Sequence, residues 1–163
     1  MRGVIDLATP AQEIQQQLMQ GEDPSVPEPE NGETLGRERA AIENFKKATL
    51  MMAGAAGLKY KQELENEQEV LMSLADMLIQ TYTAESTYLR AQKLLNELGE
   101  ERAAIPVEIV KTYVTDAAER VRVAGQNVAY VIGDDDDNML RGLLGGLKRF
   151  TRVSAYNTVA SRR

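Results

Sequence analysis

The chain has 163 residues, a formal net charge of −6, and no His, Cys or Trp. These absences exclude an imidazole base, a thiol nucleophile and a Cys/His zinc site, so only carboxylates, amines and hydroxyls remain for chemistry. The length suits one domain with an aliphatic core. The sequence has no run of 18 apolar residues, so no membrane span is expected. The N-terminus lacks the apolar core of a secretory signal, and we therefore expect a cytoplasmic protein.

The first 34 residues divide into two parts. Residues 1–20 are expected to hold one short helix, because Thr9 suits a cap, Pro10 suits the first turn, and Gln12 stands where a capping box needs it. Gly21 is expected to end this helix. Residues 21–34 are acidic and rich in proline, and they are predicted to form a flexible connection, since they have too few apolar residues to order themselves.

The remaining residues, 35–163, are predicted to form a helical bundle domain. No proline occurs from Thr34 to Leu98, and one helix of that length would span about 97 Å. A break is therefore expected between about 58 and 68, where Asn66 could cap a helix and Glu69 could reach back to it. This gives helices over 35–63 and 67–98. A third, over 106–132, begins at Pro106 and shows three-four apolar spacing.

The last predicted helix, 137–150, is amphipathic. Three glycines make it weak by itself, so its apolar side needs a partner surface. The pattern fits an interfacial helix on an anionic membrane, and it equally fits a bundle helix with a basic outer face. The apolar arc holds Met139, Leu140, Leu143, Leu144, Leu147 and Phe150, and the basic side holds Arg141, Lys148, Arg149 and Arg152. The fold class is therefore all-α: an antiparallel bundle of three long helices plus two short ones.

The acidic residues are the first candidates for a chemical site. Asp134 to Asp137 lack the spaced ligands of a calcium loop, so a solvated turn is expected, with the last carboxylate capping the next helix. Asp76 and Glu85 are nine residues apart, which places them on opposite sides of a helix, so they cannot act as one acid–base pair. Pairing with a base on the third long helix, Arg120 or Arg122, is the alternative.

Two glycine motifs, at 54–57 and 142–146, lack the spacing of a phosphate loop and favour close helix packing. The acidic total argues against a nucleic-acid partner. We therefore predict no catalytic, cofactor-binding or metal residue in this chain.

The helix 67–98 carries two apolar rows, so we expect it to be covered from more than one side and to be central in the bundle. One row repeats every seven residues, and a second lies beside it. The first is Val70, Met77, Ala84 and Ala91, and the second is Leu71, Leu74, Leu78, Tyr82 and Leu89.

The same stretch, EQEVLMSLADMLIQTYTAESTYLRAQKL, resembles the extra C-terminal helical domain of long acyl-CoA dehydrogenases, the very-long-chain type and its bacterial relatives. Residues 36–95 carry most of the resemblance, with Ala75, Asp76 and Tyr82 at its centre. In that family a separate catalytic core binds FAD and carries a catalytic Glu, and neither the Glu loop nor the flavin-binding stretches have a counterpart here.

The resemblance implies a non-catalytic accessory domain of a flavin-dependent enzyme of fatty-acid β-oxidation. Its expected roles are packing on the catalytic core in cis, oligomer control, or association with an anionic membrane surface, and a homodimer is an open alternative. A different class of function also stays open: a free-standing helical adaptor or membrane-surface module unrelated to an enzyme.

Overall fold

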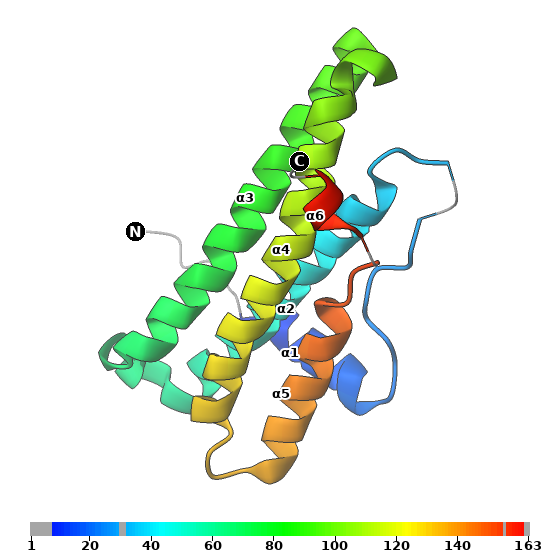
Figure 1. The fold of residues 1–163 in the computed structure, drawn as a ribbon. Helices are drawn as coiled ribbons and strands as arrows, with labels where there is room; N and C mark the ends of the chain where they lie inside the picture. Colours follow the sequence, from blue (N-terminus) through cyan, green and yellow to red (C-terminus); the bar gives the residue numbers. More distant parts are fainter. Residues whose placement is uncertain (1–7, 30–31, 155, 162–163) are drawn as a thin grey trace, which may run out of the picture.

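The computed structural model describes residues 8–29, 32–154 and 156–161, and all their regular structure is helical (Figure 1). The all-α prediction is confirmed. Two short elements were not anticipated, a 3-10 helix in the break between the first two long helices and a last turn of helix near the C-terminus. In chain order the elements are α1 (Ala8–Met19), α2 (Gly36–Tyr60), η1 (Lys61–Asn66), α3 (Gln68–Leu98), α4 (Glu100–Ile132), α5 (Asp137–Phe150) and α6 (Thr158–Ser161).

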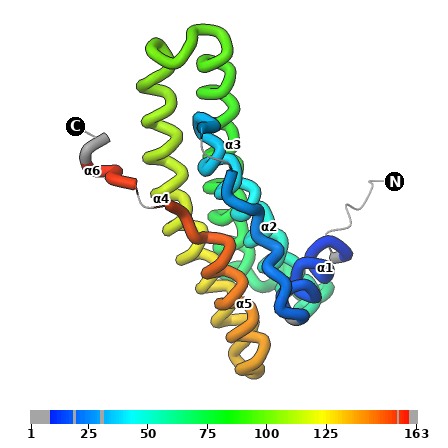
Figure 2. The backbone as a smooth tube through the Cα atoms, turned by 90° about the vertical axis from the view of Figure 1, so that its right-hand side faces the viewer, coloured from blue at the N-terminus to red at the C-terminus, as the bar shows by residue number. Residues whose placement is uncertain are grey.

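The longest helices, α3 and α4, run side by side in opposite directions, and their shared end extends beyond the rest of the molecule (Figures 1 and 2). The core lies where α2 packs against this pair and α5 packs against α2 and α4. It is aliphatic with two phenylalanines, as the composition predicts. The largest fully buried side chains include Ile42, Phe45, Met51, Met52, Met77, Ile132, Leu147 and Phe150.

The predicted break between the first two long helices is confirmed, but its capping differs. The helix α2 ends at Tyr60 and α3 begins at Gln68. Asn66 caps neither helix: its side-chain amide donates to Glu63 Oε2 at 2.9 Å. The chain turns instead through η1, where Lys61 has a positive φ of 51°. The limit on the length of one helix locates the break, whereas the path through it, η1 with Lys61 at positive φ, does not follow from the capping signal at Asn66.

The third long helix begins six residues earlier than predicted, at Glu100 rather than Pro106. Gly99, with φ of 79°, turns the chain from α3 directly into α4, and Glu100 and Glu101 place negative charge at the positive end of the new helix. Pro106 therefore lies inside α4 and cannot donate to the carbonyl of Arg102.

The first helix is held tightly against α2. A Cβ added at Gly54 would lie 2.1 Å from the Cβ of Ala11, so the two helices meet where neither has a bulky side chain. This confirms close packing as the role of Gly54, whereas an added Cβ at Gly57 would meet nothing within 4 Å. Thr9 lies inside α1 rather than before it, and the true cap falls outside the described residues.

The acidic connection between α1 and α2 has no regular structure over its described residues. It nevertheless bonds to α2: the Val26 amide donates to Asn44 Oδ1 at 2.6 Å, and Lys47 donates to the carbonyl oxygen of Pro24. Glu33 also forms an ion pair with Arg39 of α2 at 3.8 Å. Its flexibility, and the boundaries of the three predicted parts of the chain, remain predictions.

Candidate interaction surface

The second apolar row of α3 is mostly uncovered by the rest of the chain. Its residues, with Ala75 on the same side, make a surface that we call the outer row: Leu71, Ala75, Leu78, Tyr82 and Leu89. All five are exposed, Leu78 by 58% and Tyr82 by 73%. Only Leu74 of the predicted second row is buried.

The prediction that α3 is central in the bundle is therefore wrong for the described part of this chain. The seven-residue row of Val70, Met77, Ala84 and Ala91 is buried, as expected, and faces α2 and α4. The apolar arc of α3 is as wide as the sequence predicts, but periodicity does not say whether the covering surface comes from the same chain. Here one side of α3 packs inward and the other faces outward.

A polar contact borders the outer row. Glu85, on α3, accepts a hydrogen bond from Lys46 on α2 at 2.6 Å, and Lys46 also donates to Glu43 at 2.8 Å. Partial burial disfavours the charged lysine, but the hydrogen bonds to Glu43 and Glu85 outweigh it and raise the pKa of Lys46. Glu85 thus pairs with α2, not with Arg120 or Arg122 on α4 as the alternative had proposed.

The other candidate carboxylate, Asp76, is exposed and lies with Arg120 and Glu119 in a shallow hollow between α3 and α4. The helix places Asp76 and Glu85 on different sides, as predicted. Among the described residues, no group of three or more acids, His or Cys is arranged to hold a metal ion. The absence of catalytic and cofactor residues in this chain stays a prediction.

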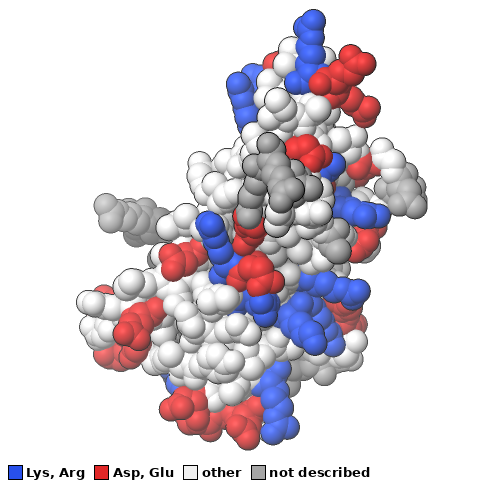
Figure 3. Space-filling model, viewed as in Figure 1, with Lys and Arg blue, Asp and Glu red and all other residues white. Residues whose placement is uncertain are grey.

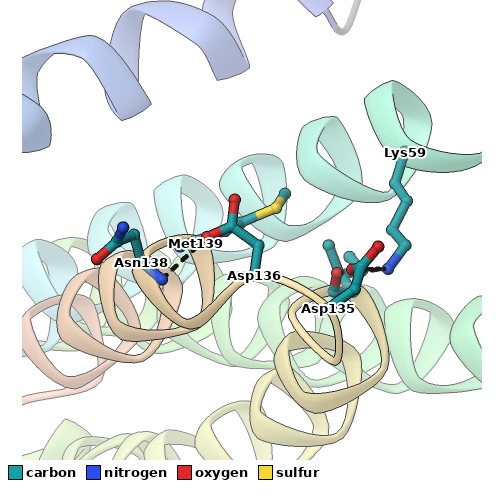
Figure 4. Close-up of polar contacts among 6 residues, drawn as sticks. Lys59, Asp135, Asp136, Asn138 and Met139 are labelled. Carbon is teal, nitrogen blue, oxygen red and sulfur yellow. Dashed lines mark hydrogen bonds and ion pairs between the residues drawn. The ribbon is translucent and has the colours of Figure 1, made fainter.

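The aspartate turn between α4 and α5 is a structural device (Figure 4). Asp136, one residue earlier than predicted, caps α5: its Oδ1 accepts from the amides of Asn138 at 2.9 Å and Met139 at 3.0 Å. Next to it, Lys59 of α2 donates to Asp135 Oδ1 at 2.7 Å and to the carbonyl of Ile132 at 2.8 Å. The Asp135 hydrogen bond raises the pKa of Lys59, and Lys59 lowers the pKa of Asp135.

The amphipathic helix α5 packs as its sequence predicts. Leu143, Leu147 and Phe150 are buried, while Arg141, Lys148 and Arg149 are exposed. In Figure 3 acidic side chains gather at the lower end of the molecule, with basic ones beside and above them on the right. Within the described residues, no helix is long and apolar enough to cross a membrane.

A groove of about 490 Å³ lies between α1 and α5. Leu18, Met51 and Leu143 form apolar parts of its lining, and Arg141 and Arg149 are also among its lining residues. The groove exists partly because α5 carries glycines there. An added Cβ would meet nothing within 4 Å at Gly142 or Gly145, whereas at Gly146 it would lie 2.8 Å from atoms of Leu18 and Met51.

Comparison with known proteins identifies the fold's relatives. The family described as "Acyl-CoA dehydrogenase, C-terminal domain" matches residues 44–149, which is more than half of the chain. A probable acyl-CoA dehydrogenase of Bacillus subtilis (strain 168) is 29% identical over 163 residues, which cover all of this chain and 26% of that protein.

A solved structure gives the same result. The crystal structure of an acyl-CoA dehydrogenase complexed with FAD from Bacillus anthracis matches 97% of this chain with a TM-score of 0.86 and 28% identity, over 26% of that structure's chain. The chain thus spans about a quarter of the length of these relatives. The resemblance noted in the α3 sequence is confirmed, and the chain belongs to the family of acyl-CoA dehydrogenase C-terminal domains.

Proposed function

We propose that this chain is a non-catalytic accessory domain of a flavin-dependent acyl-CoA dehydrogenase, and that it associates with the catalytic part of that enzyme through the outer row of α3. The observation that carries the proposal is the uncovered outer row itself. A contiguous exposed apolar surface is typical of an interaction site, whereas single exposed apolar residues are common on any protein surface. The relatives, about four times as long as this chain, have the additional polypeptide that could cover it.

A mixing experiment tests this proposal. The chain and the separately expressed catalytic part are titrated against each other by calorimetry. Tyr82→Ala should weaken the association at least about fivefold, because truncating an aromatic anchor of an interface costs more than about 1 kcal/mol, which is a factor of about five. Tyr130→Ala is the matched control, since Tyr130 is also an exposed tyrosine on a long helix, α4. Absence of association, or equal effects of the two substitutions, would contradict the proposal.

FAD and the acyl-CoA chemistry then belong to the catalytic part. We expect the chain alone to bind no FAD, because no glycine-rich phosphate cradle occurs in its sequence. An FAD titration followed by absorbance checks this, and protein that stays yellow after dialysis would contradict it. By covering a face of the catalytic part, the domain would also restrict which subunits can pack there, which is the form of oligomer control that we propose.

A second candidate role, association with an anionic membrane surface, is favoured by the exposed bases of α5. It is compatible with docking through α3, because the bases and the outer row belong to different helices. The cytoplasm remains the proposed location in either case. A module unrelated to any enzyme does not agree with the family assignment.

A further inference from the structure

The outer row has the spacing of a coiled-coil seam rather than that of an irregular patch. From Leu71 the steps to Ala75, Leu78 and Tyr82 are four, three and four residues, and Leu89 follows seven residues after Tyr82. Alternation of three and four is the pattern by which one helix accepts another along its length, at a shallow crossing angle of about 20°.

This seam parallels the one that is already filled. The buried row of α3 repeats every seven residues from Val70, and the outer row repeats every seven from Leu71, one residue later. In the buried row, Val70, Met77 and Ala84 are each 2% exposed or less, because α2 and α4 cover them. The helix thus presents two seams of equal period, and within the described part of the chain one of them lacks its partner helix.

One position in the open seam is polar. Between Tyr82 and Leu89 the place of an apolar residue is taken by Glu85, whose carboxylate pairs with Lys46; each side chain is 37% exposed. Any helix that lies along the seam must cover this ion pair. A polar residue at such a position lowers affinity but selects one register and one partner.

We infer that a single amphipathic helix of the catalytic part packs lengthwise along the outer row of α3, in a register set by the Glu85–Lys46 pair. This inference rests on the proposed function and adds to it the shape of the partner and the register of the contact. A second copy of this chain is a poorer occupant, because two-fold symmetry would cover two such ion pairs in one interface, and each loses hydration when covered.

Single cysteines provide the test, because the chain has none of its own. Leu78→Cys and Tyr82→Cys probe the seam. Asp76→Cys and Arg90→Cys are matched controls, since both are exposed on α3 outside the outer row. Maleimide labelling rates, read by peptide mass spectrometry, are compared between the chain alone and the chain joined to the catalytic part. We expect labelling to slow at least about tenfold at the two seam positions and to change less than about twofold at the controls.

The outcomes separate this inference from the proposed function. If the two parts associate but the seam cysteines keep their labelling rate, the helix-on-seam inference is overturned and the proposed function stands. If the parts do not associate at all, both fail. If the seam cysteines of the chain alone are labelled more slowly as its concentration rises, a second copy of the chain covers the outer row. This result would also overturn the inference.

The role of the ion pair has its own test. The double variant Lys46→Met, Glu85→Leu makes the seam continuously apolar by removing both charges of the pair. Glu43, the other partner of Lys46, keeps its charge, and its side chain is 45% exposed to solvent. We expect this variant to self-associate in sedimentation at concentrations at which the original chain is monomeric, because the residue that discriminates among partners is gone. A double variant that stays monomeric would show that the pair does not set partner or register.

Discussion

The close contact between α1 and α2 leads to a prediction in which two similar substitutions have opposite effects. Gly54→Ala and Gly57→Ala each replace a helical glycine in α2, and each should gain about 1 kcal/mol from helix propensity alone. At Gly57 the new methyl group enters open space, so that gain should be seen in full. At Gly54 it would lie 2.1 Å from the Cβ of Ala11, which is buried.

The magnitude follows from the overlap. At 2.1 Å the contact cannot be relieved by a side-chain rotation, because both atoms are Cβ atoms fixed to their backbones. The helix α1 must therefore move away from α2, and overpacking of this kind costs about 1–3 kcal/mol. Because both substitutions gain the same propensity, the difference between them is the packing cost, and Gly54→Ala should be less stable than Gly57→Ala by about 1–3 kcal/mol.

Urea unfolding followed by far-UV circular dichroism measures this difference, provided that the slopes of the transitions agree. Thermal unfolding is an independent check, with about 2–4 °C expected for each kcal/mol in a chain of this size. If Gly54→Ala stabilises the protein as much as Gly57→Ala does, the reasoning is refuted, because α1 then cannot lie against α2 at that glycine.

Three further predictions concern the turn between α4 and α5 and the helix that follows it. Lys59→Met should destabilise the chain by about 1–2 kcal/mol in urea unfolding, because it removes two hydrogen bonds, one to the Ile132 carbonyl at the end of α4 and one to Asp135. The pKa of Asp135 is lowered in the folded chain, so its pair with Lys59 adds to the free energy of unfolding above the pKa of the unfolded state, and this addition is lost as pH falls through the folded pKa. Acid should therefore reduce the difference in the free energy of unfolding between Lys59→Met and the original chain. Asp136→Ala should cost about 1 kcal/mol through loss of the α5 cap, again measured by urea unfolding. If α5 also touches membranes, the double variant Lys148→Glu, Arg149→Glu should bind anionic liposomes more weakly, by about 1 kcal/mol for each base, without unfolding. If the original chain does not bind such liposomes at all, α5 is only a helix of the bundle.

Much of the fold is determined by the sequence alone. The apolar spacing of the long helices, the absence of proline from Thr34 to Leu98, and the glycines near the helix ends placed the elements within a few residues, except for the start of α4, because these signals act through local backbone geometry and helix propensity. The basic outer face of α5 follows from the same periodicity. The similarity of α3 to one family was also readable, and it pointed to the correct relatives.

One local signal was outweighed by another: Pro106 is a helix-start signal in sequence, yet it lies inside α4, because Gly99 and two acidic residues begin the helix earlier. Other features were decided only by the tertiary structure. The Glu85–Lys46 pair joins residues 39 apart, and the Lys59–Ile132 hydrogen bond joins residues 73 apart. No local pattern encodes such partners, since several bases were available to each acid.

The exposure of the outer row was also decided only by the tertiary structure. Its apolar residues and their heptad spacing are visible in the sequence, but a row that is buried and a row that stays exposed in the chain have the same kind of residues and the same period. Only the packing of α2 and α4 onto one side of α3 shows which row is filled. The physical reason is that hydrophobic burial is non-directional, so a periodic pattern specifies that a face must be covered and leaves the identity of the covering surface to the assembled structure.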